Sequence, residues 1–377
     1  MKRALGWVVV AGAWAFAAWS VWAELARARE LGWFASVDLL PLWLGARALL
    51  GGLDPNDPAV LERLFDEAGL RMQPGGFASY YPPSASVLAL PLAMLPFREA
   101  ALAFRWVAAG VLVGVGALPA LGRRQGAVGW TVAGLVVALI FHTRPVRAVL
   151  ASGQPGPLVA LAAAVGLWAL ATGRSRWGAV AGVGAALKLF PLLLLPAANR
   201  RFILWFLAPL AVLGGAALAM MRGPGLWPEH LVQFVDAPMW GPWLREPAWV
   251  RGLWSARFLG PALPTAALTA WGWRQGRPAH IAAVWLAWGG LVMTGSHHYH
   301  EALVLFPALA WALAGATTGQ VGLGAAAFVA AALAWGRATS PLVPPSSLHW
   351  VPMGWAVWTA CLAGAFSARG VCSSRPE

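Results

Sequence analysis

One acidic residue near an apolar boundary is a candidate for proton transfer. Asp38 lies between Val37 and Leu39, shortly after the first long apolar block ends. A carboxylate at such a boundary is partly desolvated, which makes it a stronger base. An interfacial ion pair with Arg27 or Arg29 explains the same position equally well. Asp38 is therefore predicted to be either a general base or one half of such a pair.

A single lysine is a candidate for binding an anion. Lys188 is the only lysine after residue 2, and it lies in the apolar block 178–196, just before Phe190-Pro191. A lysine at membrane depth costs about 2.5–3.5 kcal/mol on insertion scales unless it reaches water or an anion. It could snorkel to the interface. Because Leu-Phe-Pro breaks the helix beside it, we favour a functional role as a compact point charge.

Three histidines, a tyrosine and an acid follow one another in the segment 296–301, within an otherwise apolar region. His298 and Glu301 are three residues apart, a spacing that suits a metal site on a helix. The favoured interpretation is that His297, His298 and His300 donate hydrogen bonds to a sugar or phosphate. A solvated turn is the third interpretation.

A second group of candidates lies before and within a break in the backbone. Arg144 and Arg147 flank Pro145, and the sequence 152–157 then interrupts the chain with Gly153, Gln154 and two prolines. Arginines at a membrane edge suit a lipid-linked phosphate. Ordinary headgroup anchoring explains their charge as well.

Two of the three tyrosines of the chain are adjacent. Tyr80 and Tyr81 precede Pro82-Pro83. They could stack on a sugar or contact it through their hydroxyl groups, although the pair alone is a weak signal.

The elements that must position these residues are membrane-spanning helices. Of the 377 residues, 59% are hydrophobic and 11% are charged, against roughly 25% charged in soluble domains. The apolar residues form long blocks, typical of helices and not of a barrel. The prediction is one all-α polytopic membrane domain, 1–377, with about 10–12 transmembrane helices. The net charge of +13 then favours phospholipid headgroups as partners, and not nucleic acid.

Short arginine clusters between the apolar blocks predict the orientation of the chain. Because Lys and Arg in short loops resist translocation, these clusters and both termini are expected on the cytoplasmic side. The first apolar run is interpreted as a retained span, since it is longer than the core of a signal peptide. The predicted spans are about 4–24, 98–121, 127–142, 155–172, 202–221, 259–274, 281–296, 301–316, 318–336 and 351–368.

Two outer loops follow from this topology, about 25–83 and 222–258, and they hold nearly all the acids. Within the first, 42–50 is expected to form a helix lying in the interface. The blocks 84–97 and 178–199 fit no single crossing and predict interrupted or re-entrant segments that could wall a site. The pairs Gly110/Gly114 and Gly178/Gly182 are expected to mark close helix contacts.

Several familiar catalytic signatures are missing from the sequence. It has no phosphate-binding Gly-x-x-x-x-Gly-Lys-Ser/Thr loop, no Gly-x-Gly-x-x-Gly turn and no His-Glu-x-x-His. Nucleotide hydrolysis and zinc proteolysis are therefore unsupported. A donor used on the outer face would also not be a nucleotide sugar, because those are kept in the cytoplasm.

The order of the candidate pieces resembles that of the GT-C membrane glycosyltransferases, and more narrowly that of glycosyltransferase family 87. That family contains bacterial polyprenol-phosphate-mannose-dependent α-mannosyltransferases and their relatives. The likeness covers roughly residues 30–310. It rests on Asp38 after the first span, Tyr81-Pro82-Pro83 opening a proline-bounded helix, Gly153-Gln154, Lys188 near Pro191, and His297-His298-Tyr299.

The resemblance implies a GT-C fold, a polyprenyl-phosphate sugar donor and inversion at the anomeric carbon. Asp38 matches the catalytic acid of the first outer loop by position. Gln154, Lys188 and the pair His297-His298 match residues that line the donor pocket. The sequence departs from the family pattern at Pro41 and at Pro155, which leaves the sugar and the acceptor open.

The expected activity is transfer of mannose or a related hexose or pentose to a lipid or glycan acceptor, at the outer face of the plasma membrane. Asp38 would deprotonate the acceptor, and Lys188 or an outer arginine would stabilise the leaving phosphate. The scheme requires no cofactor, and it is compatible with a divalent metal without needing one. The alternatives are a lipid-linked sugar transporter or flippase, and a non-catalytic protein of envelope assembly.

Overall fold

Every regular element in the described part of the chain is a helix, as the sequence predicts. The computed structural model describes residues 2–32, 35–70, 81–121, 126–221, 225, 229, 263–274, 276 and 278–293. The predicted spans 301–316, 318–336 and 351–368 lie outside these residues. The helices are α1 (Lys2–Glu30), α2 (Leu40–Leu50), α3 (Pro58–Glu67), α4 (Pro83–Leu88), α5 (Leu90–Ala93), α6 (Phe97–Leu121), α7 (Gly126–Phe141), α8 (Arg144–Ser152), α9 (Gly156–Thr172), the 3₁₀ helix η2 (Ser175–Trp177), α10 (Gly178–Leu187), the 3₁₀ helix η3 (Phe190–Ala197), α11 (Arg200–Met220) and α15 (Pro278–Met293).

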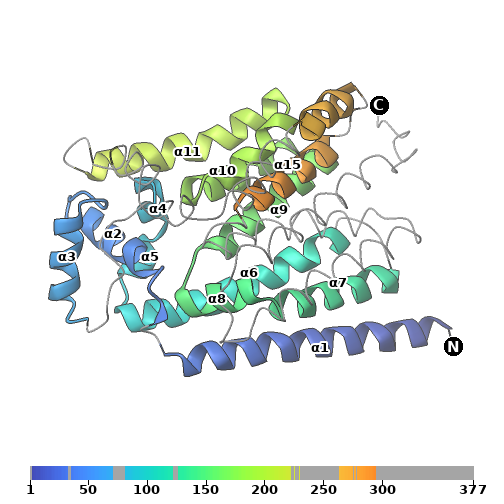
Figure 1. Ribbon diagram of the computed structural model, residues 1–377, viewed down its shortest axis with the longest axis horizontal. Helices are drawn as coiled ribbons and strands as arrows, with labels where there is room; N and C mark the ends of the chain where they lie inside the picture. The colour runs from blue at the N-terminus through green and yellow to red at the C-terminus, as the bar shows by residue number, and fades with distance from the viewer. Residues whose placement is uncertain are drawn as a thin grey trace, which may run out of the picture.

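The protein has the helices of a polytopic membrane protein. Among the described residues, Ala4–Glu30, Phe97–Ala117 and Arg200–Met220 are long and apolar enough to cross a membrane, and the pair Gly126–Phe141 and Val146–Ser152, bent by 60°, would add a fourth span. These helices agree with the predicted spans to within a few residues at most ends. In Figure 1, α1 and α7 lie side by side along the long axis of the molecule.

The block 178–199 forms two short arms joined at Lys188. The α10 arm has ten residues and the η3 arm eight, so each is about 15 Å long, half of a typical hydrocarbon core. The hydroxyl of Ser175, before the first arm, donates a hydrogen bond to Oδ1 of Asn199, after the second, at 3.3 Å. The first arm therefore begins, and the second arm ends, at the same end of the bundle. The block is interrupted as predicted, and it forms a re-entrant hairpin.

Small residues allow the hairpin to pack between its neighbours α9 and α11. A Cβ at Gly178 would lie 2.9 Å from the carbonyl oxygen of Phe202, and one at Gly182 would collide with the carbonyl oxygen of Phe206. The predicted close contact at Gly178/Gly182 is thus confirmed. Among the described residues no close contact is found at Gly110/Gly114: none lies within 4 Å of a Cβ at Gly110, and a Cβ at Gly114 meets only the side chain of Leu161 at 3.7 Å.

The first loop and the block 84–97 form a cap of short helices at one end of the bundle (Figure 1). The helix expected at 42–50 is α2, but most of its residues are buried, because α3, α4 and α5 pack around it. It is therefore covered by protein on most sides, and it does not simply lie in the interface. The block 84–97 is interrupted as predicted, with α4 and α5 separated at Ala89.

We predict that Gly182→Ala lowers the stability of the protein by about 1–3 kcal/mol, because the new methyl group has no room beside α11. The effect should appear as a lower unfolding temperature of the purified protein in detergent. Gly214→Ala is the matched control, since no described residue lies within 4 Å of a Cβ at that position. Equal unfolding temperatures for the two variants would contradict the close packing of α10 on α11.

Candidate functional site

The turn of the re-entrant hairpin brings Lys188 to residues from two distant parts of the chain. Its Nζ donates a hydrogen bond to Oε1 of Gln154 at 2.8 Å. The same atom lies 5.5 Å from the centre of the Tyr81 ring, within the range of a cation–π contact. Three of the candidates chosen from the sequence therefore form one cluster, in which Gln154 is buried and Lys188 and Tyr81 are partly exposed. The ammonium group thus contacts a protein amide and an aromatic ring, and its role in binding a phosphate stays a prediction.

Gln154 is fixed by the turn between α8 and α9. Gly153 ends α8 with a φ of +74°, a left-handed conformation that glycine adopts without strain. A Cβ at this position would lie 2.8 Å from Cβ of Leu39. Gly153 is therefore required twice, for its backbone conformation and for the close approach of the segment 36–39. Gln154 itself is only 6% exposed, so its side-chain amide is buried in the protein.

Asp38 is held against the same turn by its backbone. Its N–H donates a hydrogen bond to the carbonyl of Ser152 at 2.9 Å. The side chain is partly exposed and makes no ion pair with Arg27 or Arg29, both of which the structure describes. Arg27 pairs instead with Glu24. The structure therefore does not show the ion-pair interpretation of Asp38, whose neighbour along the chain, Leu39, is fully buried.

Two buried polar residues that the sequence analysis did not select hold Tyr81 in place. Asn56, 1% exposed, donates a hydrogen bond from Nδ2 to the carbonyl of Tyr81 at 2.9 Å. The hydroxyl of Ser84 donates to the carbonyl of Ala186 at 2.7 Å, next to the hairpin turn. The start of α4 is thereby tied directly to the end of α10.

Arg105 is the most important residue that sequence reasoning missed. It belongs to α6, is 3% exposed, and its guanidinium donates four hydrogen bonds, all to oxygens of other segments. The acceptors are the carbonyls of Ala28 (2.8 Å), Gly32 (2.6 Å) and Ala151 (3.2 Å) and the hydroxyl of Ser36 (3.1 Å). It therefore clamps the chain before Asp38 to the end of α8. An ionisable residue inside a predicted span was the available signal.

The remaining candidates lie elsewhere or are not described. Arg147 forms a two-pronged ion pair with Glu24 of α1, from Nε to Oε2 at 3.1 Å and from Nη2 to Oε1 at 3.1 Å. The Glu24 side chain is 1% exposed, so this pair neutralises a buried acid, and a phosphate contact by Arg147 stays a prediction. Arg144 begins α8, and its side chain is not described. Tyr80, His297, His298 and His300 lie outside the described residues.

The described residues contain no group of three His, Cys, Asp or Glu side chains that could hold a metal ion. The histidine segment, where the metal interpretation arose, is not among them. The cluster that is described offers instead one ammonium, one amide and one phenol ring, and the backbone of Asp38 bonds to Ser152, two residues before Gln154. Such groups suit a hydroxyl-rich, phosphate-bearing ligand.

Comparison with known families decides what kind of protein carries this cluster. The model of glycosyltransferase family 87 matches residues 80–341, which is more than half of the chain and includes Tyr81, Gln154 and Lys188. The chain belongs to glycosyltransferase family 87. This family 87 member is therefore a glycosyltransferase, with a sugar donor and an acceptor. No curated protein and no solved structure matches it.

We predict that Arg105→Met loosens the segment before Asp38, because it leaves carbonyl oxygens without donors at about 1–3 kcal/mol each. Amide hydrogen exchange at Asp38, whose N–H bonds to Ser152, should become at least about tenfold faster. Arg98→Met, at an exposed position near the start of the same helix, should leave this exchange unchanged. Unaltered protection in the Arg105 variant would show that the clamp does not hold the segment.

Proposed function

We propose that this family 87 glycosyltransferase takes its sugar from a polyprenyl-phosphate donor and inverts the anomeric carbon. The observation that carries the proposal is the contact of Lys188 with Gln154 and Tyr81 at the turn of the re-entrant hairpin. A lysine set at the end of two half-length arms places a positive charge about 15 Å into the bundle. A lipid-linked phosphate reaches such a depth more readily than a soluble nucleotide does.

Lys188 is the group that would stabilise the leaving phosphate. When the bond between the anomeric carbon and the phosphate oxygen breaks, negative charge grows on that oxygen. A positioned cation in a site shielded from water lowers the energy of this charge more than water does. Gln154 and Tyr81 orient the ammonium, and neither of them contributes a negative charge that would compete with the phosphate.

Asp38 is the group that would accept the proton. An acceptor hydroxyl loses its proton to the carboxylate while its oxygen attacks the anomeric carbon from the side opposite the phosphate. One bond to the anomeric carbon forms as the other breaks, which gives inversion. Because a phosphate monoester anion leaves without prior protonation, no general acid is needed. The hydrogen bond of Asp38 to Ser152 sets this residue beside the turn that carries Gln154.

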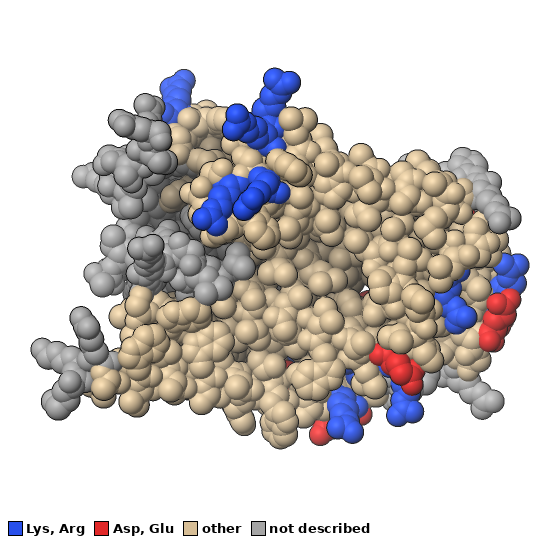
Figure 2. Space-filling model, turned by 180° about the vertical axis from the view of Figure 1, so that it is seen from behind, with Lys and Arg blue, Asp and Glu red and all other residues tan. Residues whose placement is uncertain are grey.

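The distribution of charge supports an outer location for this site. Exposed arginines cluster where η2 and α11 begin, whereas the described acids of the first loop lie around α3. Figure 2 shows basic side chains gathered without acids at one end of the molecule, whereas toward the other end and along the lower edge acids and basic side chains are mixed. By the positive-inside tendency, the arginine end faces the cytoplasm and the site faces outward. We therefore propose a single GT-C membrane domain in the plasma membrane with both termini cytoplasmic.

The donor sugar is proposed to be mannose or a related hexose or pentose, and the acceptor a lipid or glycan. Re-entrant segments beside a buried charge also occur in transporters, so a lipid-linked sugar flippase is the second candidate. The two differ in one product: only the transferase makes a new glycosidic bond.

We predict that Asp38→Asn reduces transfer from polyprenyl-phosphate mannose by about 10²–10⁴-fold, because the amide cannot accept the proton. Donor binding should stay close to that of the unaltered protein. Transfer is followed by mass spectrometry of the glycosylated product. Asp66→Asn, which alters an exposed acid of α3, should transfer normally. Full activity of the Asp38 variant would remove the residue from the mechanism, and flux across liposomes without any product would favour the flippase.

We predict that Lys188→Met weakens donor binding by about 10–100-fold, since a charge-assisted hydrogen bond to the phosphate is lost. Binding is measured on protein with the same elution profile and unfolding temperature as the original. Arg98→Met removes an exposed cation elsewhere and should bind the donor normally. Undiminished affinity in the Lys188 variant would mean that the lysine only anchors the hairpin.

A further inference from the structure

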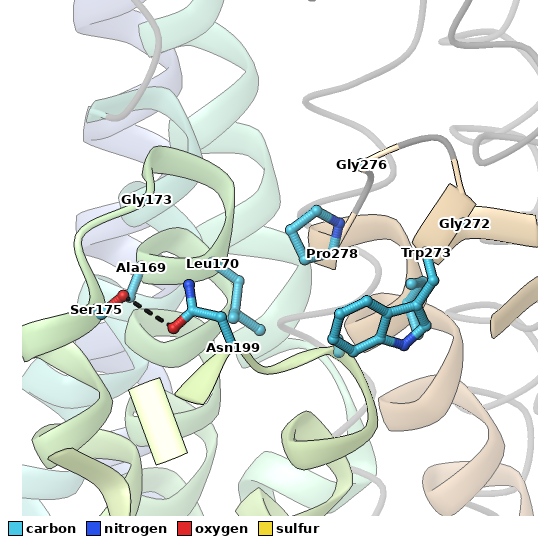
Figure 3. A pocket seen from close by; sticks show the side chains of 11 residues that line it. Ala169, Leu170, Gly173, Ser175, Asn199, Gly272, Trp273, Gly276 and Pro278 are labelled. Atoms are coloured by element: carbon cyan, nitrogen blue, oxygen red, sulfur yellow. Dashed lines mark hydrogen bonds between the residues drawn. The ribbon is translucent and has the colours of Figure 1, made fainter. Parts of the chain in front are cut away.

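A second polar region lies at the opposite end of the hairpin from Lys188. A cavity of about 350 Å³ opens where the two arms begin and end, between the end of α9, η2, the start of α11 and the residues around 272–281. In Figure 3, Leu170 and Asn199 lie on one wall, and Trp273 and Pro278 face them from the other. At one edge of the cavity the hydroxyl of Ser175 donates a hydrogen bond to Oδ1 of Asn199.

Exposed arginines adjoin this cavity on every segment that forms it. Each lies next to, or one residue beyond, a residue of the lining, and all are exposed: Arg174, Arg176, Arg200, Arg201 and Arg274. Within the described ranges none of them pairs with a carboxylate. The same end of Figure 2 shows basic side chains and no acids. Among the described residues, the segments around the cavity therefore carry a rim of exposed arginines that no carboxylate neutralises.

The walls below this rim are apolar and aromatic. Leu170 and Ile281 contribute to the lining. Trp273 is 53% exposed, and its indole N–H donates to the carbonyl of Pro196 at 2.8 Å. Trp168 carries Arg174 over its ring at 5.2 Å. Tryptophans with a polar edge and an apolar face are typical of the membrane–water interface. A ligand of this cavity must therefore combine an anionic group with hydrocarbon.

We propose that this cavity binds an anionic phospholipid of the surrounding membrane. The phosphate lies between the arginines at the start of α11 and the side chain of Asn199, and an acyl chain follows the wall formed by Leu170 and Trp273. A free phosphate would use the arginines but leave the apolar wall without a partner. The site is separate from the sugar chemistry, because the length of α10 lies between it and Lys188.

A lipid bound in this cavity would stabilise the re-entrant hairpin. Asn199 and Ser175 mark the two ends of the re-entrant segment, and a lipid that bridges the cavity fastens both to the helix 263–274. Bound lipid is therefore expected to raise the unfolding temperature of the protein as well as to be retained by it.

The test uses the full-length protein purified in a neutral detergent and titrated with phosphatidylglycerol or phosphatidylcholine, with bound lipid counted by native mass spectrometry. Phosphatidylglycerol should bind at least about fivefold more tightly, and Arg200→Gln/Arg201→Gln should reduce this affinity by about tenfold or more. Arg63→Gln/Arg98→Gln removes the same charge from exposed positions outside the rim and should keep it. Equal binding of both lipids, or equal loss in the two double variants, would overturn the proposal.

Two further measurements separate a lipid site from a charged surface. Trp273→Ala leaves every arginine in place and should still weaken phosphatidylglycerol binding several-fold, because the acyl chain loses its wall. Inorganic phosphate should fail to displace the lipid at concentrations that match the lipid phosphate. Unchanged binding by the Trp273 variant, or full displacement by phosphate, would show that the arginines bind anions without a lipid pocket.

Discussion

A charged lysine inside an apolar bundle needs polar partners, and the arrangement around Lys188 follows from that need. Lys188 is partly buried, and withdrawing an ammonium group from water without polar partners is unfavourable. Its hydrogen bond to Gln154 requires the turn at 153–154. That turn requires a glycine, because the segment 36–39 packs too closely against Gly153 to leave room for a Cβ. The segment in turn needs the clamp of Arg105. One long-range polar contact thus depends on a chain of backbone constraints that also sets the position of Asp38.

Two kinds of feature could be interpreted from the sequence: a rare residue type and an interrupted apolar block. Lys188 stood out because the chain uses arginine nearly everywhere else, and the place of block 178–199 between two cytoplasmic-type arginine clusters indicated an interrupted or re-entrant segment. Both signals are local and follow from the cost of charge and of broken helices in hydrocarbon. The family resemblance rested on the order of such signals, and the match over residues 80–341 confirms it.

Contacts between residues of distant segments could not be predicted in this way. The acceptors of Arg105 are mostly carbonyls, which every residue carries, so nothing in their sequence marks them. The pair of Glu24 and Arg147 joins residues 123 positions apart, and the charge pattern had instead suggested a phosphate ligand. The two Gly-x-x-x-Gly pairs look alike in sequence, yet among the described residues only Gly178/Gly182 meets a neighbouring backbone, because packing depends on which face of a helix is turned toward another.

The residues that fix Asp38 are synthesised well after Asp38 itself. The segment carrying Asp38 emerges from the ribosome early. Arg105, which clamps this segment, follows 77 residues after Ala28. Ser152, whose carbonyl accepts the hydrogen bond from the N–H of Asp38, comes later still. Until those helices are inserted, the acid has no fixed surroundings. The constellation around it is complete only after the hairpin has been made, so a truncated translation product that ends before Lys188 would contain the acid without the pocket.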